Sequence, residues 1–465
     1  MELHTSCADG LVDDVRVCLD RGDDVNGTGE DEEQPPLYLA CESGHVDVTR
    51  LLIDRGADLD KASEYGETPL YAACEKGHAD AATLLLARGA SVDKSDMDGI
   101  TPLFAACERG HTEAARPCLE HGADVERLDQ DGASPFLIAC ENGHVDAARL
   151  CLEHGADVER TTQDEFTPLM VACLKSCVDA ARMCLENGAD VNRATPEGAT
   201  ALSIACQEGC ADAVWLCLER GANVNLTKEG ASPLYVACQE GYADSAMICC
   251  DHGADIDLAN ANGATPLYVS CQNGHLDLAT LLVDRGADFD KARQDGATPL
   301  YVSSQNGYAD AVTLLLDRGA DFDKATQSGA TPLYIACQEG CTDAVQLLLQ
   351  RGAAVDRAER DGVTPLLIAS HKGHTDAMRL LLDHGADYNW VDQEDWGSVQ
   401  IACLDGHLDA VRLLLDRGAN INAARQNGAT PLYIACEVNH TPWFSFSLTA
   451  VPRSTKATGT GGRRF

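Results

Sequence analysis

Histidine and cysteine share one recurring position in this chain, directly after a glycine, and both residue types bind zinc. The set comprises His45, His78, His111, His144, His275, His374, His407, Cys177, Cys210 and Cys341. Consecutive members such as His45 and His78 are 33 residues apart. Zinc ligands lie within about 2.3 Å of one ion, so residues separated by a whole structural unit cannot share it. We therefore expect these residues to stabilise turns, and we predict no metal site.

Aspartates form a second candidate set, in short segments that resemble calcium loops. In Asp96-Met97-Asp98-Gly99, the first ligand position would be Lys94 and the twelfth, where an acid is expected, would be Ala105. The segment 129–132 would place Arg127 first, so it fails in the same way. No phosphate loop and no Ser/His/Asp or Cys/His catalytic set stands out. The sequence thus predicts no catalytic residue and no cofactor.

Most of the 22 cysteines also recur at this regular spacing of about 33 residues. One position holds Cys41, Cys74, Cys107, Cys140, Cys173, Cys206, Cys238, Cys271, Cys337, Cys403 and Cys436, and a second holds Cys118, Cys151, Cys184, Cys217 and Cys250. Equivalent cysteines in stacked units would be about 10 Å apart, whereas a disulfide needs Cα atoms within roughly 7 Å. We expect free, buried thiols in a reducing compartment.

All of these positions belong to a phrase that recurs along the chain. Its proline position is occupied by Pro36, Pro69, Pro102, Pro135, Pro168, Ala201, Pro233, Pro266, Pro299, Pro332, Pro365, Ser398 and Pro431. Every step is 33 residues except that from Ala201 to Pro233, which is 32. A fixed period of this length indicates one supersecondary unit stacked many times, with an extended surface in place of a closed pocket.

Each unit reads as two short helices and a hairpin, as residues 66–93 illustrate. The Thr68 side chain can cap a helix over residues 69–75. Pro69 then occupies the first helical position, where a missing N–H costs nothing. Gly77 ends this helix, and a second helix follows over about residues 79–87. The Asp- and Gly-rich segment after Gly89 should form an extended turn. Helices this short persist only by stacking on their neighbours.

The phrase T-P-L-x-x-A, then G-H, L-L-L and G-A-D-V-N or G-A-D-V-D, resembles the ankyrin repeat over about residues 1–440. The resemblance implies an all-α solenoid of about 13–14 units, acting as a non-enzymatic binding module. Residues 1–34 would be an N-terminal capping repeat and 35–440 the array, with a truncated last unit. Residues 441–465 would be a basic, disordered tail. Register and charge change after Glu437, which leaves two interpretations open: a truncated or mis-spliced gene, or a real tail that docks on the array.

The formal net charge of −39 is the other strong constraint. Such a field repels nucleic acid and anionic lipid and attracts basic partners, although acidity also keeps a Leu-rich stack soluble. No apolar run approaches the roughly 20 residues needed to cross a bilayer, so we expect no membrane insertion. The acidic N-terminus shows no secretory signal, which favours the cytoplasm, with the nucleus as an alternative.

Family resemblance places a binding groove along the hairpin tips and the two residues before the inter-helix glycine. The candidates in our prediction are Glu75, Lys76, Glu108, Arg109, Gln239, Glu240, Gln272, Asn273, Gln305, Asn306, Gln338 and Glu339. Their amides and acids suit a peptide with Lys or Arg side chains, while a plain solvated face is the competing interpretation.

Two tryptophans form a further candidate. Trp390 and Trp396 flank a hairpin whose usual glycine is Asp395. We expect both to be exposed, as binding anchors or after local repacking. Tyrosine replaces the family's usual histidine after T-P-L, where it either packs between first helices or faces the groove; examples are Tyr38, Tyr71, Tyr235, Tyr268, Tyr301, Tyr334 and Tyr433.

The predicted function is an intracellular, monomeric interaction scaffold or adaptor that binds protein segments, in particular basic ones, in an acidic groove. The alternative is a regulatory or targeting arm of a larger, truncated multidomain protein.

Overall fold

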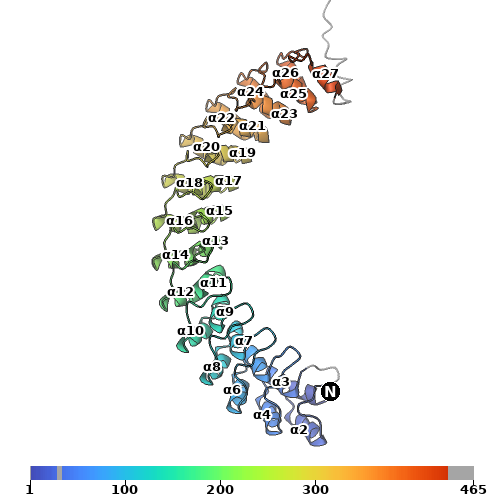
Figure 1. Ribbon diagram of the computed structural model, residues 1–465, viewed down its shortest axis with the longest axis vertical. Helices are drawn as coiled ribbons and strands as arrows, with labels where there is room; N and C mark the ends of the chain where they lie inside the picture. The colour runs from blue at the N-terminus through green and yellow to red at the C-terminus, as the bar shows by residue number, and fades with distance from the viewer. Residues whose placement is uncertain (1, 29–33, 438–465) are drawn as a thin grey trace, which may run out of the picture. The chain divides into compact units, whose positions relative to one another are not determined.

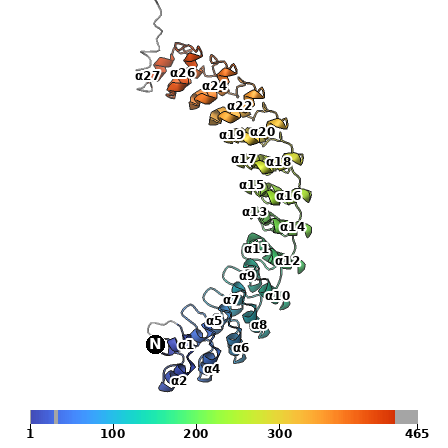
Figure 2. The same cartoon turned by 180° about the vertical axis from the view of Figure 1, so that it is seen from behind.

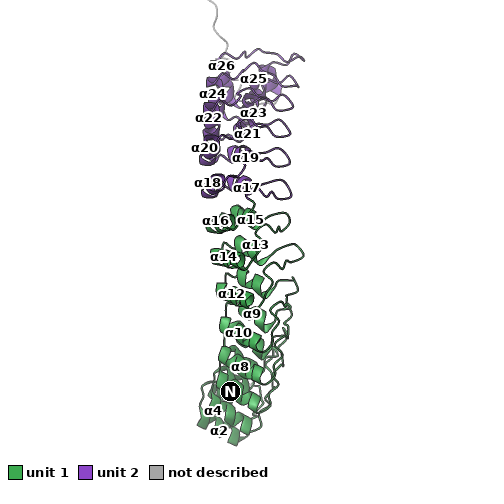
Figure 3. Cartoon of the chain, turned by 90° about the vertical axis from the view of Figure 1, so that its left-hand side faces the viewer, with its two compact units in different colours: residues 1–255 green, residues 256–465 purple. Residues whose placement is uncertain are grey.

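The computed structural model describes residues 2–28 and 34–437, and the predictions about the tail at 441–465 lie outside these ranges. The described residues form 27 α-helices and three isolated β-bridges, with no longer strand among them. The chain divides into two compact units, residues 1–255 and 256–465 (Figure 3).

Unit 1 alternates first and second helices of successive repeats. The first helices are α1 (Glu2–Ala8), α3 (Pro36–Glu42), α5 (Pro69–Glu75), α7 (Pro102–Arg109), α9 (Pro135–Glu141), α11 (Pro168–Leu174), α13 (Ala201–Gln207) and α15 (Pro233–Glu240). The second helices are α2 (Val12–Arg21), α4 (Val46–Asp54), α6 (Ala79–Ala87), α8 (Thr112–Glu120), α10 (Val145–Glu153), α12 (Val178–Glu186), α14 (Ala211–Glu219) and α16 (Ala243–Asp251).

Unit 2 continues the same alternation. Its first helices are α17 (Pro266–Asn273), α19 (Pro299–Asn306), α21 (Pro332–Glu339), α23 (Pro365–Lys372), α25 (Ser398–Leu404) and α27 (Pro431–Glu437). Its second helices are α18 (Leu276–Asp284), α20 (Ala309–Asp317), α22 (Thr342–Gln350), α24 (Thr375–Asp383) and α26 (Leu408–Asp416).

Within each unit the helices make two layers. First helices contact first helices of the neighbouring repeats, as α3, α5 and α7 do, and second helices contact second helices (Figures 1 and 2). The hairpins project from the first-helix layer, on the side away from the second helices (Figure 3). The predicted all-α repeat architecture is confirmed, and the expected helices at 69–75 and 79–87 have the bounds of α5 and α6.

Most first helices begin at a Thr-Pro or Ser-Pro pair. The Thr68 hydroxyl accepts a hydrogen bond of 3.1 Å from the backbone N–H of Tyr71, and Thr101 caps α7 in the same way. Proline then occupies a position whose N–H has no helical partner. Ala201 replaces proline at the start of α13, where Thr200 and Ser203 form a reciprocal capping box.

Glycine at the inter-helix turn is required by close packing as well as by backbone geometry. Gly77 has φ of 79°, and a Cβ at this position would lie 2.8 Å from Nδ1 of His111 in the next repeat. The histidines themselves bind backbone: Nε2 of His78 lies 3.0 Å from the Glu42 carbonyl oxygen one repeat earlier. They are therefore repeat-to-repeat braces. The structure describes no group of three or more potential metal ligands in residues 2–28 and 34–437.

The acidic side chains of the hairpins also bind backbone N–H groups of the next repeat. The side chain of Asp60 accepts a hydrogen bond of 2.9 Å from the N–H of Ser91, and Glu126 accepts one of 2.8 Å from Asp157. Each bond joins one hairpin to the next repeat. A carboxylate or amide at this position therefore satisfies a backbone donor that would otherwise have no protein partner.

The cysteines are free thiols, and most are buried in the core. Our sequence alignment of the second position was wrong at one residue: Cys249, with none of its side chain exposed, takes the buried position, and Cys250 is half-buried. The 32-residue step between Ala201 and Pro233 shifts the register of α16 by one residue. Cysteines at unlike positions of neighbouring repeats also come into contact, as Cys74 and Cys118 do.

Candidate protein-binding surface

The predicted binding residues lie where the first helices end. From the repeat of α5 onwards, we call the polar residues among the two that precede each inter-helix turn the helix-end row. In unit 1 it comprises Glu75, Lys76, Glu108, Arg109, Glu141, Asn142, Lys175, Gln207, Glu208, Gln239 and Glu240. In unit 2 it comprises Gln272, Asn273, Gln305, Asn306, Gln338, Glu339, His371, Lys372 and Asp405. All are exposed or half-buried, and so are accessible to a partner.

In the early repeats of unit 1, the cations of the row form salt bridges with acids of the preceding repeat. Arg109 Nη2 lies 3.4 Å from Glu75 Oε1, and Lys76 Nζ lies 3.9 Å from Glu42 Oε1. Lys175 Nζ lies 3.3 Å from Glu141 Oε1. Such solvent-accessible pairs stabilise the protein by at most about 1 kcal/mol each, so a partner can exchange them at little cost.

The last two repeats of unit 1 carry acids without basic partners. Glu208 and Glu240 are exposed, and neither forms a salt bridge within the described residues. Glu240 accepts a hydrogen bond of 2.8 Å from the side-chain amide of Gln239. This end of the row is consequently its most anionic part, with polar donors beside the carboxylates.

The row in unit 2 is dominated by amides. Asn306 Nδ2 donates a hydrogen bond of 2.8 Å to the carbonyl oxygen of Gln272, and Gln338 donates one of 2.8 Å to Glu339. Farther along, His371 Nδ1 lies 2.7 Å from Asp405 Oδ2. Exposed amides offer both donors and acceptors, which suits hydrogen bonding to an extended peptide.

The predicted candidates therefore divide between the two units. Residues from Glu75 to Glu240 belong to unit 1, and those from Gln272 to Trp396 belong to unit 2. Each unit presents its own row, whereas the sequence-based prediction assigned all of these residues to one groove.

The two tryptophans differ from each other. Trp390 is 39% exposed, and its Nε1 donates a hydrogen bond of 2.9 Å to the Gly362 carbonyl oxygen. Trp396 is half-buried, and the guanidinium carbon of Arg425 lies 3.6 Å from its ring centroid. The expectation of exposure holds for Trp390 and is wrong for Trp396, because Arg425 from the next hairpin covers that ring.

The tyrosines that replace histidine mostly pack inside the array, as the first of the two interpretations predicted. Tyr38, Tyr71, Tyr235 and Tyr268 are at least nine-tenths buried. The Tyr38 hydroxyl donates a hydrogen bond of 2.9 Å to Glu67 in the following hairpin, and burial together with this carboxylate raises the pKa of Tyr38. Tyr433 differs, with 59% of its side chain exposed.

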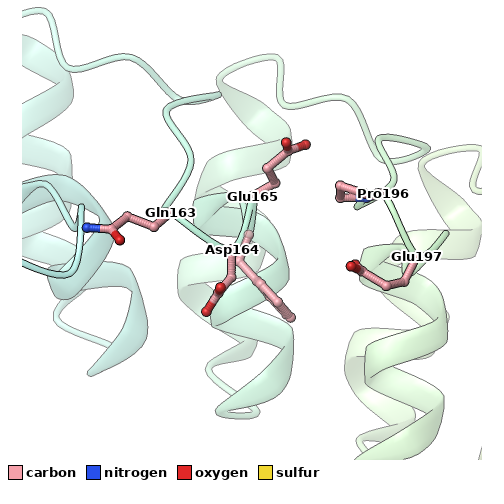
Figure 4. A pocket seen from close by; sticks show the side chains of 6 residues that line it. Gln163, Asp164, Glu165, Pro196 and Glu197 are labelled. Atoms are coloured by element: carbon pink, nitrogen blue, oxygen red, sulfur yellow. The ribbon is translucent and has the colours of Figure 1, made fainter.

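A hollow between two hairpins was not predicted from the sequence. It has a volume of about 370 Å3 and lies between the hairpins that precede α11 and α13. Its lining comprises Gln163, Asp164, Glu165, Phe166, Pro196 and Glu197 (Figure 4). The side chains of Glu165 and Glu197 both reach into the space between the hairpins. The signal in the sequence was the loss of glycine at Glu165, whose φ is 60°.

Repeats, caps, hairpins and turn braces together define a helical repeat protein, and the comparison with protein families gives its class. A family model described as ankyrin repeats (three copies) matches overlapping segments that run from residue 3 to 162 and from 169 to 446. The chain belongs to the ankyrin repeat family. No curated protein matches it in sequence. None of the helices in residues 2–28 and 34–437 has the length and apolar character required to cross a bilayer.

Proposed function

We propose that this protein is a non-enzymatic scaffold that binds basic segments of other proteins along its helix-end rows. Ankyrin repeats are in general protein–protein interaction modules, which supports the class of function. The observation that carries the finer proposal is the exposed acid pair Glu208 and Glu240, which has no salt-bridge partner in the described structure.

Charge and hydrogen-bonding capacity support a basic ligand. The chain carries a formal charge of −39, so its field favours the approach of cations and disfavours nucleic acid. Along the row, Gln207 and Gln239 adjoin the two acids. Carboxylates pair with Lys or Arg, and neighbouring amides can bind the backbone of the same peptide.

Rigidity also supports the proposal. Hydrogen bonds to backbone groups tie neighbouring repeats together, as in the contacts of His78 with the Glu42 carbonyl and of Asp60 with the Ser91 N–H. A surface held in this way loses little conformational entropy when a partner binds. The buried free thiols, such as Cys41, fit a reducing compartment, and we place the protein in the cytoplasm or nucleus as a monomer.

The test compares two labelled peptides of equal length, one rich in Lys and Arg and one rich in Asp and Glu, titrated against the full chain. We expect the basic peptide to bind, and its affinity to fall as salt rises from low to about 0.15 M, where screening acts over about 8 Å. Equal binding of both peptides, or binding of the basic one that is indifferent to salt, would contradict the proposal.

A further inference from the structure

A column of cysteine thiols runs through the core of unit 1, and its members meet in pairs. The sulfur atoms are 3.4 Å apart in Cys74–Cys118 and 3.5 Å apart in Cys107–Cys151. They are 3.8 Å apart in Cys140–Cys184 and 3.7 Å apart in Cys206–Cys249. The thiol of Cys173 forms the same kind of hydrogen bond with that of Cys217. Five consecutive repeat boundaries therefore contain a thiol–thiol contact.

Each pair crosses from one repeat to the next. Cys74 lies on α5, and Cys118 lies on α8, the second helix of the following repeat. Helix α5 contacts α8, α7 contacts α10, and α9 contacts α12. The two members of a pair are 44 residues apart, or 43 for Cys206–Cys249, where the repeat is shorter by one. A covalent bond within a pair would fasten neighbouring repeats together.

We propose that these five pairs are oxidation sites, at which peroxide converts the facing thiols into disulfides that staple adjacent repeats of unit 1. Oxidation at these sites does not require the proposed protein partner. The sulfurs are already in van der Waals contact, so bond formation requires an approach of under about 2 Å to reach the disulfide length of roughly 2.05 Å.

The chemistry balances with hydrogen peroxide as the oxidant. One thiol, reacting as its thiolate, attacks a peroxide oxygen and becomes a sulfenic acid, and the second peroxide oxygen leaves as water. The facing thiol then attacks the sulfenic sulfur and releases a second water. Two thiols are oxidised by two electrons, one peroxide is reduced to two waters, and each pair loses two hydrogens.

Burial sets the rate of this reaction, whereas geometry sets its product. The paired cysteines have almost no exposed surface. The contact with Cys118 and burial raise the pKa of Cys74, and the contact with Cys151 and burial raise that of Cys107, which keeps both thiols protonated at neutral pH. Oxidation consequently requires a local opening of the repeat boundary, after which reclosure returns the sulfurs to each other.

The chain contains its own matched controls. Cys41 occupies the same position as Cys74 and is equally buried, but its sulfur faces the hydroxyl of Thr49 at 3.7 Å. Cys271 is likewise fully buried and forms its hydrogen bond with Ser303. Both lack a facing thiol among their described hydrogen-bond partners, so opening alone should not link them.

The experiment treats the full chain with hydrogen peroxide, blocks remaining thiols under denaturing conditions, and maps linked peptides by mass spectrometry. We expect the five predicted links and no link at Cys41 or Cys271. Mild urea should accelerate link formation without changing the pairing, because it favours opening. Links between Cys107 and Cys118 within one repeat, links at the controls, or sulfinic acids in place of links would overturn the proposal.

A variant keeps the test independent of folding defects. Cys107→Ser introduces the residue that another repeat already carries, since Ser304 is fully buried at the equivalent position. It should abolish the Cys107–Cys151 link, leave Cys151 reduced, and preserve the other four links. The oxidised parent chain should also unfold at higher urea than its reduced form. Unchanged unfolding despite all five links would refute the stapling role.

Discussion

The Arg425 side chain closes the hairpin that contains Trp396. Its guanidinium carbon lies 3.6 Å from the ring centroid, and Nη2 donates a hydrogen bond of 2.7 Å to the carbonyl oxygen of Glu394. Nε donates a second bond, of 3.2 Å, to the carbonyl oxygen of Asp395. Two successive hairpins of unit 2 are therefore held together by one cation.

Arg425→Ala should loosen this hairpin by about 1–2 kcal/mol, because it removes a cation–π contact and two hydrogen bonds to carbonyls. Amide hydrogen exchange in peptides that cover residues 390–397 should accelerate, by roughly tenfold for each 1.4 kcal/mol. Arg412→Ala removes the same charge from a solvent-exposed pair with Asp409 and should change this exchange little. Equal exchange in both variants would show that Arg425 does not hold the hairpin.

Glu165→Gly should stabilise the chain. Glu165 has φ of 60°, a left-handed conformation that glycine adopts without steric cost. We expect an increase of about 0.5–1 kcal/mol in the free energy of unfolding, measured by urea denaturation. Asp164, one residue earlier, is not among the non-glycine residues with a positive φ. Asp164→Gly should therefore destabilise the chain by a similar amount. The same sign for both substitutions would contradict the strain argument.

Thr101→Ala should destabilise α7 by about 1 kcal/mol, because the Thr101 hydroxyl accepts the Phe104 N–H at 3.2 Å and alanine offers no acceptor. Thr83→Ala is the matched control. The Thr83 hydroxyl only bonds back to the Ala79 carbonyl oxygen, on an exposed face of α6. This control should be neutral within about 0.5 kcal/mol. Denaturation midpoints that fall equally would argue against the capping role.

Alkaline pH should weaken the fold through the buried thiols. Burial raises the pKa of Cys41 from its ordinary value of 9.0 to about 12, and it does the same for Cys271. Between these values the folded state binds more protons than the unfolded state. Stability contributed in this way is complete below pH 9 and falls by about 1.4 kcal/mol per pH unit for each such thiol as pH rises toward 12.

Cys41→Ser isolates one of these thiols. Between about pH 8 and about pH 10.5, the variant should lose about 2 kcal/mol less unfolding free energy than the parent, as measured by urea titration at each pH. Serine is tolerated at this position, as buried Ser304 shows. An unchanged pH dependence would mean that Cys41 titrates alike in both states.

The fold could be predicted almost to the residue because its signals are local. Thr68-Pro69 marks the start of α5, and Gly77 marks the turn to α6, in each case through a backbone requirement of that position. The misassignment of Cys250 arose where the period changes to 32 residues, since a one-residue shift on a helix moves a side chain by about 100°.

Contacts between different positions of neighbouring repeats could not be predicted from the local sequence. The Cys74–Cys118 contact joins a first helix to the second helix of the next repeat, which equal-position arguments do not consider. Arg425 covers Trp396 from the following hairpin, so composition around Trp396 alone predicted an exposed ring. Both contacts depend on how one repeat is placed on the next. The residue types of a single repeat do not determine this placement.

The most direct test of the proposed function places the same charge change at two sites of unit 1. Glu208→Lys with Glu240→Lys reverses the acids of the helix-end row, whereas Glu120→Lys with Glu153→Lys reverses two exposed acids at the ends of α8 and α10. Each double variant changes the formal charge from −39 to −35.

Affinity for the Lys- and Arg-rich peptide is then measured by titration at fixed low salt. The proposal predicts a large loss of affinity for the row variant, about tenfold or more for the roughly 1.5–3 kcal/mol expected of charged hydrogen bonds. The control variant should change affinity only slightly. An equal loss in both variants would show that the peptide responds to the overall field, and would contradict a binding site on the helix-end row.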